Sequence, residues 1–159
     1  MVEPTSAPSG DDLDGSDEGL PSSRPPASFA PVKTWVIQTV RELSELRAQI
    51  LAEVGPAGSG RVPELDSVAH HMVLVASELA TNALRHGIPP TIVRLLRDGS
   101  TYLLDVADHD LGTVPYVAGS RPPGLGGFGL QISRRLAVDV GWYATATTKH
   151  VWARFPVPA

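Results

Sequence analysis

Apolar residues recur along this chain at two spacings, which predict helices and strands in a definite order. Between residues 40 and 86 they return every three or four positions, the spacing of one helix face. The first such stretch ends near Gly55-Pro56, and the second runs from an expected N-cap at Asp66 to Gly87. The second helix has the clearer buried stripe, which consists of Val68, Met72, Val75, Leu79 and Ala83.

Short runs rich in apolar and β-branched residues predict strands. They cover 32–37, 91–97, 101–108, 140–146 and 150–157. The turn 98-DGS-100 between two of these runs is a strong hairpin signal. A third helix is expected over 128–138. The order β-α-α-β-β-α-β-β predicts an α/β fold of the α+β type, a two-layer sandwich in which three helices cover one face of a mostly antiparallel sheet.

Charge divides the chain into two parts. Residues 1–31 contain six acidic residues and one arginine, a net charge of −5, and few large apolar groups. We expect this segment to be a disordered acidic tail, followed by one domain over 32–159. The domain contains 11 acidic and 12 basic residues, a net of +1, which argues against direct nucleic-acid binding.

Several features of the composition bear on location. No stretch is long and apolar enough to span a membrane, and no signal peptide is recognisable at the N-terminus. The chain has no cysteine, which excludes disulfides and thiolate metal sites. We therefore expect a cytoplasmic protein that does not contact a membrane.

A glycine-rich stretch, 122-PPGLGGFGLQIS-133, closes a loop of about twenty residues and leads into the third expected helix. Glycine loops that feed a helix N-terminus bind phosphates through unpaired backbone N–H groups. The glycines also match the dinucleotide pattern G-x-G-x-x-G, but the βαβ context that this pattern needs is missing. A glycine-rich turn without a ligand is the alternative.

Three polar residues on neighbouring elements could serve a nucleotide. Glu78 and Asn82 stand at i and i+4 on one face of the second helix. Asn82 offers a neutral oxygen ligand for Mg²⁺, and Glu78 can accept a proton from a hydroxyl group. Asp108 ends a strand and can accept a hydrogen bond from an exocyclic amine. A solvated helix face and a turn-forming aspartate are the alternatives.

The order of these motifs resembles the GHKL ATPase superfamily of gyrase, histidine kinases and MutL. The segment 78-ELATNALRHG-87 resembles the N box of the stand-alone anti-sigma factor serine/threonine kinases, and 126-GGFGLQI-132 resembles their second glycine box. The resemblance covers roughly residues 32–157. It implies the Bergerat-type ATP-binding fold, with ATP and Mg²⁺ as cofactors and a role in transcription regulation.

The resemblance also assigns roles to individual residues. Glu78 would be the general base, Asn82 would coordinate Mg²⁺, Asp108 would bind the adenine amine, and 109–126 would form the ATP lid. The implied cofactor-binding positions are Asn82, Asp108, Gly112, Gly126, Gly127, Gly129 and Leu130. The implied partners are an anti-anti-sigma-type protein, a sigma factor, or both, and a second copy of the chain in a homodimer.

The chain departs from the family pattern at one position. The first glycine box, roughly D-x-G-x-G in the family, reads 108-DHDLG-112, so Asp110 replaces a glycine. Its side chain would crowd the base and its charge would disfavour phosphates. A module that binds a partner without phosphotransfer is therefore a second hypothesis. A histidine-kinase fragment is a third, but no helix pair bearing a phosphorylatable histidine is recognisable upstream.

Overall fold

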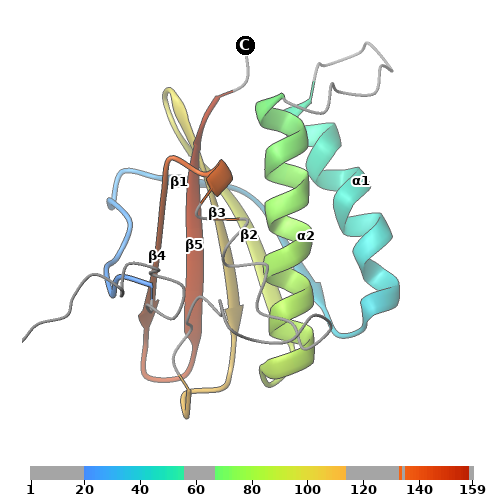
Figure 1. Ribbon diagram of the computed structural model, residues 1–159, viewed down its shortest axis with the longest axis vertical. Coiled ribbons are helices and arrows are strands. Elements are labelled where there is room, and N and C mark those ends of the chain that lie inside the picture. The colour runs from blue at the N-terminus through green and yellow to red at the C-terminus, as the bar shows by residue number, and fades with distance from the viewer. Residues whose placement is uncertain (1–19, 56–66, 114–132, 134, 158–159) are drawn as a thin grey trace, which may run out of the picture.

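The computed structural model describes residues 20–55, 67–113, 133 and 135–157. In chain order, the elements are β1 (Ala30–Ile37), a 3₁₀ turn η2 (Val40–Glu42), α1 (Leu43–Val54), α2 (Val68–His86), β2 (Thr91–Asp98), β3 (Thr101–Asp108), β4 (Asp139–Ala144) and β5 (Lys149–Pro156). Figure 1 shows two layers, a sheet and the pair of α-helices that packs on one of its faces.

The strands form one five-stranded sheet in the order β1-β2-β3-β5-β4, and every neighbouring pair is antiparallel. The β2–β3 hairpin turns at Gly99, whose φ of 53° is the left-handed conformation that glycine adopts without a steric penalty. The DGS hairpin signal is thereby confirmed. β3 and β5 occupy central positions, and Asp108 pairs with Lys149 at one end of the sheet.

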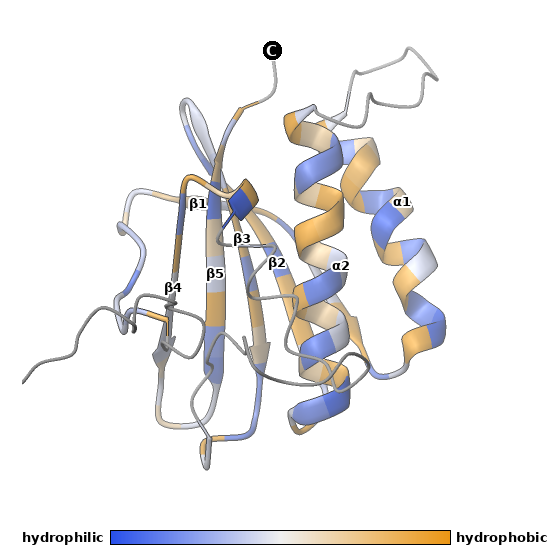
Figure 2. Ribbon diagram, in the orientation of Figure 1, coloured by the Kyte–Doolittle hydropathy of each residue, from blue (hydrophilic) through white to orange (hydrophobic). Residues whose placement is uncertain are grey.

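The apolar stripe of α2 fills the space between the layers. Met72, Val75 and Leu79 are fully or almost fully buried, as the helical spacing predicts, and α2 packs on β2, β3 and β5. α1 packs beside α2 through its own buried residues, Leu43, Leu46, Ile50 and Val54. In Figure 2, the apolar colour follows these facing surfaces while polar residues occupy the solvent side. Burial of this stripe fixes how α2 lies across the sheet.

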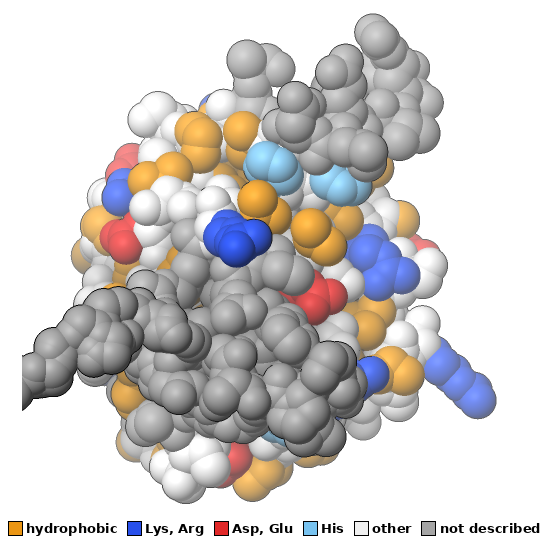
Figure 3. Space-filling model, viewed as in Figure 1, with side chains coloured by type: hydrophobic (Ala, Val, Ile, Leu, Met, Phe, Trp, Pro, Cys, Tyr) orange, Lys and Arg blue, Asp and Glu red, His pale blue; other side chains and the backbone are white. Residues whose placement is uncertain are grey.

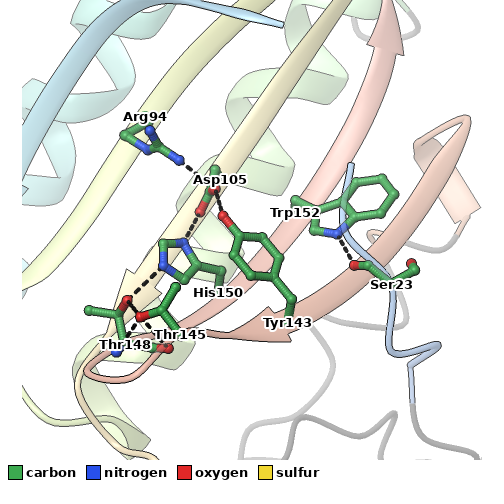
Figure 4. A network of polar contacts seen from close by, with 8 residues as sticks. All are labelled: Ser23, Arg94, Asp105, Tyr143, Thr145, Thr148, His150 and Trp152. Atoms are coloured by element: carbon green, nitrogen blue, oxygen red, sulfur yellow. Dashed lines mark hydrogen bonds and ion pairs between the residues drawn. The ribbon is translucent and has the colours of Figure 1, made fainter. Parts of the chain in front are cut away.

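The opposite face of the sheet carries a polar network centred on Asp105, which is 1 % exposed. Figure 4 shows three donors converging on its carboxylate: the Arg94 guanidinium at 3.0 Å, the Tyr143 hydroxyl at 3.1 Å and Nδ1 of His150 at 2.8 Å. Burial and the neighbouring carboxylate raise the pKa of Tyr143 to about 12. The other ring nitrogen of His150 lies 2.8 Å from the hydroxyl of Thr148. The buried charge is thus fully engaged inside the fold.

Residues 20–29 correct the expectation of a disordered tail over 1–31. Leu20 is 5 % exposed and belongs to the main core, and Ser22 forms a parallel β-bridge with Trp142. Nε1 of Trp152 donates to the carbonyl oxygen of Ser23, and the Arg24 guanidinium lies over the Tyr143 ring. This segment therefore packs along β4 and onto the far face of the sheet. Residues 1–19 lie outside the described residues.

Two helix expectations also change. Ser67, rather than Asp66, caps α2, and its side chain accepts a hydrogen bond from the backbone N–H of His70. The described residues contain two α-helices, not three. Most of the expected third helix, 128–138, lies outside the described residues. A helical turn is present at its end, where the N–H of Ala137 donates to the carbonyl oxygen of Ser133.

The Asp105 network predicts a large effect of one substitution. Asp105→Asn removes the charge that Arg94 and His150 face, and it turns an amide donor toward groups that are themselves donors. We expect a loss of about 2–4 kcal/mol in the free energy of unfolding, measured by urea denaturation. Asp139→Asn is the matched control, because that carboxylate is 54 % exposed and lies 3.9 Å from Arg154. An equally small effect at both sites would contradict the network's role.

The packing of residues 20–29 predicts a second effect. Leu20→Ala leaves a cavity in the main core, so we expect a loss of about 2–4 kcal/mol in unfolding free energy. Leu111→Ala is the control, since that side chain is 49 % exposed. Equal denaturation midpoints for the Leu20 variant and the wild type would show that this segment is not part of the folded domain.

Candidate functional site

Glu78 and Asn82 lie one turn apart on the same face of α2, as their i, i+4 spacing predicts. Both side chains are half-buried. Ser77 beside them is 8 % exposed, and its hydroxyl accepts a hydrogen bond of 3.0 Å from Nη1 of Arg47 on α1. This bond joins α1 to α2 at the residue that precedes Glu78 in the sequence. In Figure 3, histidine side chains gather near the beginning of α2, whereas Glu78 and Asn82 belong to its second half.

Asp108 stands at the end of β3 and is 5 % exposed. Its Oδ1 accepts a hydrogen bond of 2.7 Å from the backbone N–H of Asp110, which turns the chain out of the strand. The alternative of a turn-forming aspartate is thus part of the structure. The second oxygen, Oδ2, faces the end of α2 and the Lys149 ammonium. A buried carboxylate with one oxygen free of short hydrogen bonds from described residues is a suitable acceptor for an amine.

The end of α2 meets Asp108 at Gly87. A Cβ atom added to Gly87 would overlap Cγ of Asp108 and would lie 2.6 Å from Oδ2 of Asp108 and 2.7 Å from the carbonyl oxygen of Ala83. The following turn is tied to the same place, because the N–H of His109 donates to the carbonyl oxygen of Ile88 at 3.0 Å. The helix bearing Glu78 and Asn82 and the strand bearing Asp108 therefore converge, and only glycine allows this approach.

Asp110, the departure from the glycine-box pattern, turns its carboxylate into its own loop. Oδ1 accepts from the N–H of Gly112 at 2.9 Å, and Oδ2 accepts from the hydroxyl of Thr113 at 2.9 Å. These hydrogen bonds, the Gly112 N–H foremost, and the nearby Lys149 charge lower the pKa of Asp110. The charge that would disfavour phosphates is therefore already engaged by donors of residues 112 and 113.

Lys149 and Thr91 also lie at this end of the sheet, although neither is among the expected site residues. The Lys149 side chain is 11 % exposed, and its Nζ lies 3.9 Å from Oδ2 of Asp108 and 3.1 Å from Oγ1 of Thr113. Thr91 begins β2, is fully buried, and its hydroxyl has no hydrogen-bond partner among the described residues. The pairing of β3 with β5 places Lys149 directly opposite Asp108.

Four expected cofactor-binding positions, Gly126, Gly127, Gly129 and Leu130, lie outside the described residues, as does most of the expected lid, 109–126. Gly112 is described, and its N–H is used by Asp110. The structure thus describes the N-box residues, Asp108 and the beginning of the first glycine box. It shows that the helix bearing Glu78 and Asn82 ends, at Gly87, against the Asp108 carboxylate.

The oxygen ligands present fit a metal that arrives with a nucleotide. No group of three or more His, Asp or Glu side chains gathers among the residues that the structure describes. Mg²⁺ keeps several waters and binds through one or two protein ligands plus substrate phosphates. Asn82 is suited to that limited role.

In the described part of the chain, no helix has the length and apolar character needed to cross a membrane.

Comparison with known proteins establishes a likeness of fold. Neither a protein-family model nor a curated protein sequence matches this chain. Among solved structures, the chain is similar to the RsbU and RsbW domains of Rv1364c from Mycobacterium tuberculosis, with a TM-score of 0.52 and 19% identity. The match covers 82% of this chain and 34% of that one, so this protein spans about a third of the matched chain's length. At this level of identity the likeness is one of fold alone, and it agrees with the α+β sandwich that the order of elements predicts.

The contact at Gly87 predicts a steric effect. Gly87→Ala places a methyl group against the Asp108 carboxylate and the Ala83 carbonyl, so the end of α2 must shift away from β3. We expect a loss of about 1–3 kcal/mol in unfolding free energy, measured by denaturant titration. Gly112→Ala is the control, because the nearest atom to its added Cβ lies 3.4 Å away, an ordinary contact. Equal losses in the two variants would argue against a close-packed junction.

Proposed function

We propose that this protein is an ATP-binding regulatory protein that acts as an anti-sigma factor-like serine/threonine protein kinase and uses Mg-ATP. One observation carries the proposal: α2, with Glu78 and Asn82 on one face, ends against the buried carboxylate of Asp108 through the Gly87 contact. The resemblance of 78-ELATNALRHG-87 to the N box and the fold likeness to a chain containing an RsbW domain support the same hypothesis.

The roles divide along α2 and β3. Asp108 would accept a hydrogen bond from the adenine amine, which sets the base at the C-terminal end of α2. Asn82, one turn or so before that end, would bind Mg²⁺ together with the phosphates. The unpartnered hydroxyl of Thr91, buried near Asp108, is a polar atom that a bound ligand or water would satisfy.

Phosphotransfer needs a base at the attacking hydroxyl. Glu78 would take the proton of a serine or threonine hydroxyl on the partner protein as that oxygen bonds to the γ-phosphorus. The bond from this phosphorus to the β–γ bridging oxygen breaks, and ADP leaves with the bridging oxygen. Glu78 is half-buried, which lets a partner's side chain reach it.

The substrate partner we propose is an anti-anti-sigma-type protein, with a sigma factor as a second partner whose release the phosphorylation controls. Such a regulator would work in the cytoplasm, and a homodimer is the assembly implied by the resemblance. These assignments rest on the resemblance of the motifs and on the fold likeness. In this proposal, the protein makes no direct contact with nucleic acid or with a membrane.

A module that binds a partner without phosphotransfer is the second candidate. The observation that favours it is the internal engagement of the first glycine box, where Asp110 binds the N–H of Gly112 and the hydroxyl of Thr113. Backbone N–H groups bound in this way are not available to a ligand. ATP binding without transfer to any partner, and without hydrolysis, would identify this function.

The first test is isothermal titration of ATP into the full chain with Mg²⁺ present. We expect micromolar binding that Asn82→Ala weakens at least about tenfold, because the metal loses its protein ligand. With EDTA in place of Mg²⁺, the two proteins should bind ATP equally. Glu78→Gln should bind Mg-ATP as the wild type does and lose phosphotransfer, read out with γ-labelled ATP.

His71→Ala is the control on the same helix, since His71 lies at the other end of α2. It should bind ATP like the wild type. Absence of ATP binding to the wild type would overturn the nucleotide site. Transfer that survives Glu78→Gln would remove that residue from the role of general base.

A further inference from the structure

Lys149 is a lysine whose side chain is largely buried. The side chain is 11 % exposed, whereas lysine side chains are almost never fully buried without a partner. It begins β5, where it pairs directly with Asp108 of β3. Because paired residues point to the same face of a sheet, the ammonium lies on the helix-covered side, beside the carboxylate.

The partners of this ammonium do not use all of its donors. It has three N–H groups, and Thr113 accepts one at 3.1 Å. Oδ2 of Asp108 lies at 3.9 Å, within ion-pair range but too far for a short hydrogen bond. Among the described residues, no other hydrogen-bond partner of Lys149 is present, so donor capacity remains beside Asp108.

Thr91 adds a third polar group to the same place. Ile92 pairs with Ala107, so Thr91 lies one step further along β2, opposite Asp108 and on the same face. Its side chain is fully buried, and its hydroxyl has no partner among the described residues. A buried acceptor, a buried cationic donor and an unpartnered hydroxyl thus meet where α2 ends. These three groups are suited to bind the polar edge of a ligand, because a hydrogen bond to a complementary atom stabilises each buried polar group.

We propose that Lys149 is a specificity-determining residue for the nucleotide base: it donates a hydrogen bond to ring nitrogen N1 of adenine while Asp108 accepts from the N6 amine. This inference rests on the proposed ATP site and adds the residue that binds ring nitrogen N1, the atom next to the carbon that carries the amine. Adenine presents a donor and an acceptor side by side, which complements a carboxylate beside an ammonium. Hypoxanthine reverses both, with an oxygen in place of the amine and an N–H at N1, so in the same pose it would meet both groups unfavourably.

The test is a cycle that pairs a side-chain change with a single-atom change in the ligand. The probes are ATP and 1-deaza-ATP, in which a C–H group replaces N1, and binding is measured by titration calorimetry with Mg²⁺. For the wild type, we expect 1-deaza-ATP to bind about tenfold more weakly, as for the loss of a hydrogen bond to a charged donor. For Lys149→Met, which keeps the chain length without the donor, the two ligands should bind equally.

Two further variants complete the cycle. Lys149→Arg keeps a cationic donor and should restore part of the preference for ATP. Lys33→Met is the matched control, because Lys33 is an exposed lysine on β1 with an ion pair of 4.0 Å to Glu53. It should keep the wild-type ratio of affinities. Inosine triphosphate should bind the wild type more weakly than ATP.

The outcomes separate this inference from the proposed function. If the wild type binds ATP and 1-deaza-ATP equally, Lys149 does not read N1, while the ATP site stands. The same holds if Lys149→Met keeps a tenfold preference for ATP. If the wild type binds no ATP at all, the proposed function and this inference both fall. The wild-type comparison of the two ligands needs no variant, so it holds even where Lys149→Met does not fold.

Discussion

The close approach of α2 to the end of β3 is the constraint on which the candidate site depends. The apolar stripe of α2 is buried on β2, β3 and β5, which fixes the line of the helix across the sheet. Gly87 then allows the last turn to rest on the Asp108 carboxylate, where any side chain would clash. Glu78 and Asn82 are positioned relative to Asp108 by this contact, since they are fixed on the same rigid helix.

The two faces of the sheet are stabilised by different interactions, apolar burial on one and hydrogen bonds to a buried carboxylate on the other. Apolar burial under α2 and α1 supplies the main core, whereas the far face holds a buried carboxylate that three donors satisfy. Residues 20–29 extend along β4 and over this far face. The far-face network resembles a catalytic relay in composition, but its groups are engaged with one another and with packed neighbours. We therefore assign it to stability, and the site to the helix-covered side.

Charge at the candidate site is balanced locally. Asp108 at the end of β3 and Asp110 in the loop that follows place two carboxylates two residues apart, an arrangement that would repel an incoming phosphate if both were free. Asp110 is instead bound by residues 112 and 113, and Lys149 lies near both acids. Asp110 is thus accompanied by a cation on β5, the strand beside β3. The same lysine is the donor that we propose to bind ring nitrogen N1 of the base.

The sequence alone determined the elements whose signals are local. The spacing of apolar residues predicted α1 and α2, the Asp-Gly turn predicted the β2–β3 hairpin, and the N-box pattern placed Glu78 and Asn82 on one helix face. Tertiary structure decided what depends on distant segments. Strand register brought Lys149 to Asp108, sheet pairing buried Asp105, and packing against β4 ordered Leu20 within a segment whose composition predicts disorder. Local composition contains no record of such neighbours, because they are separated by many residues and meet only in the folded chain.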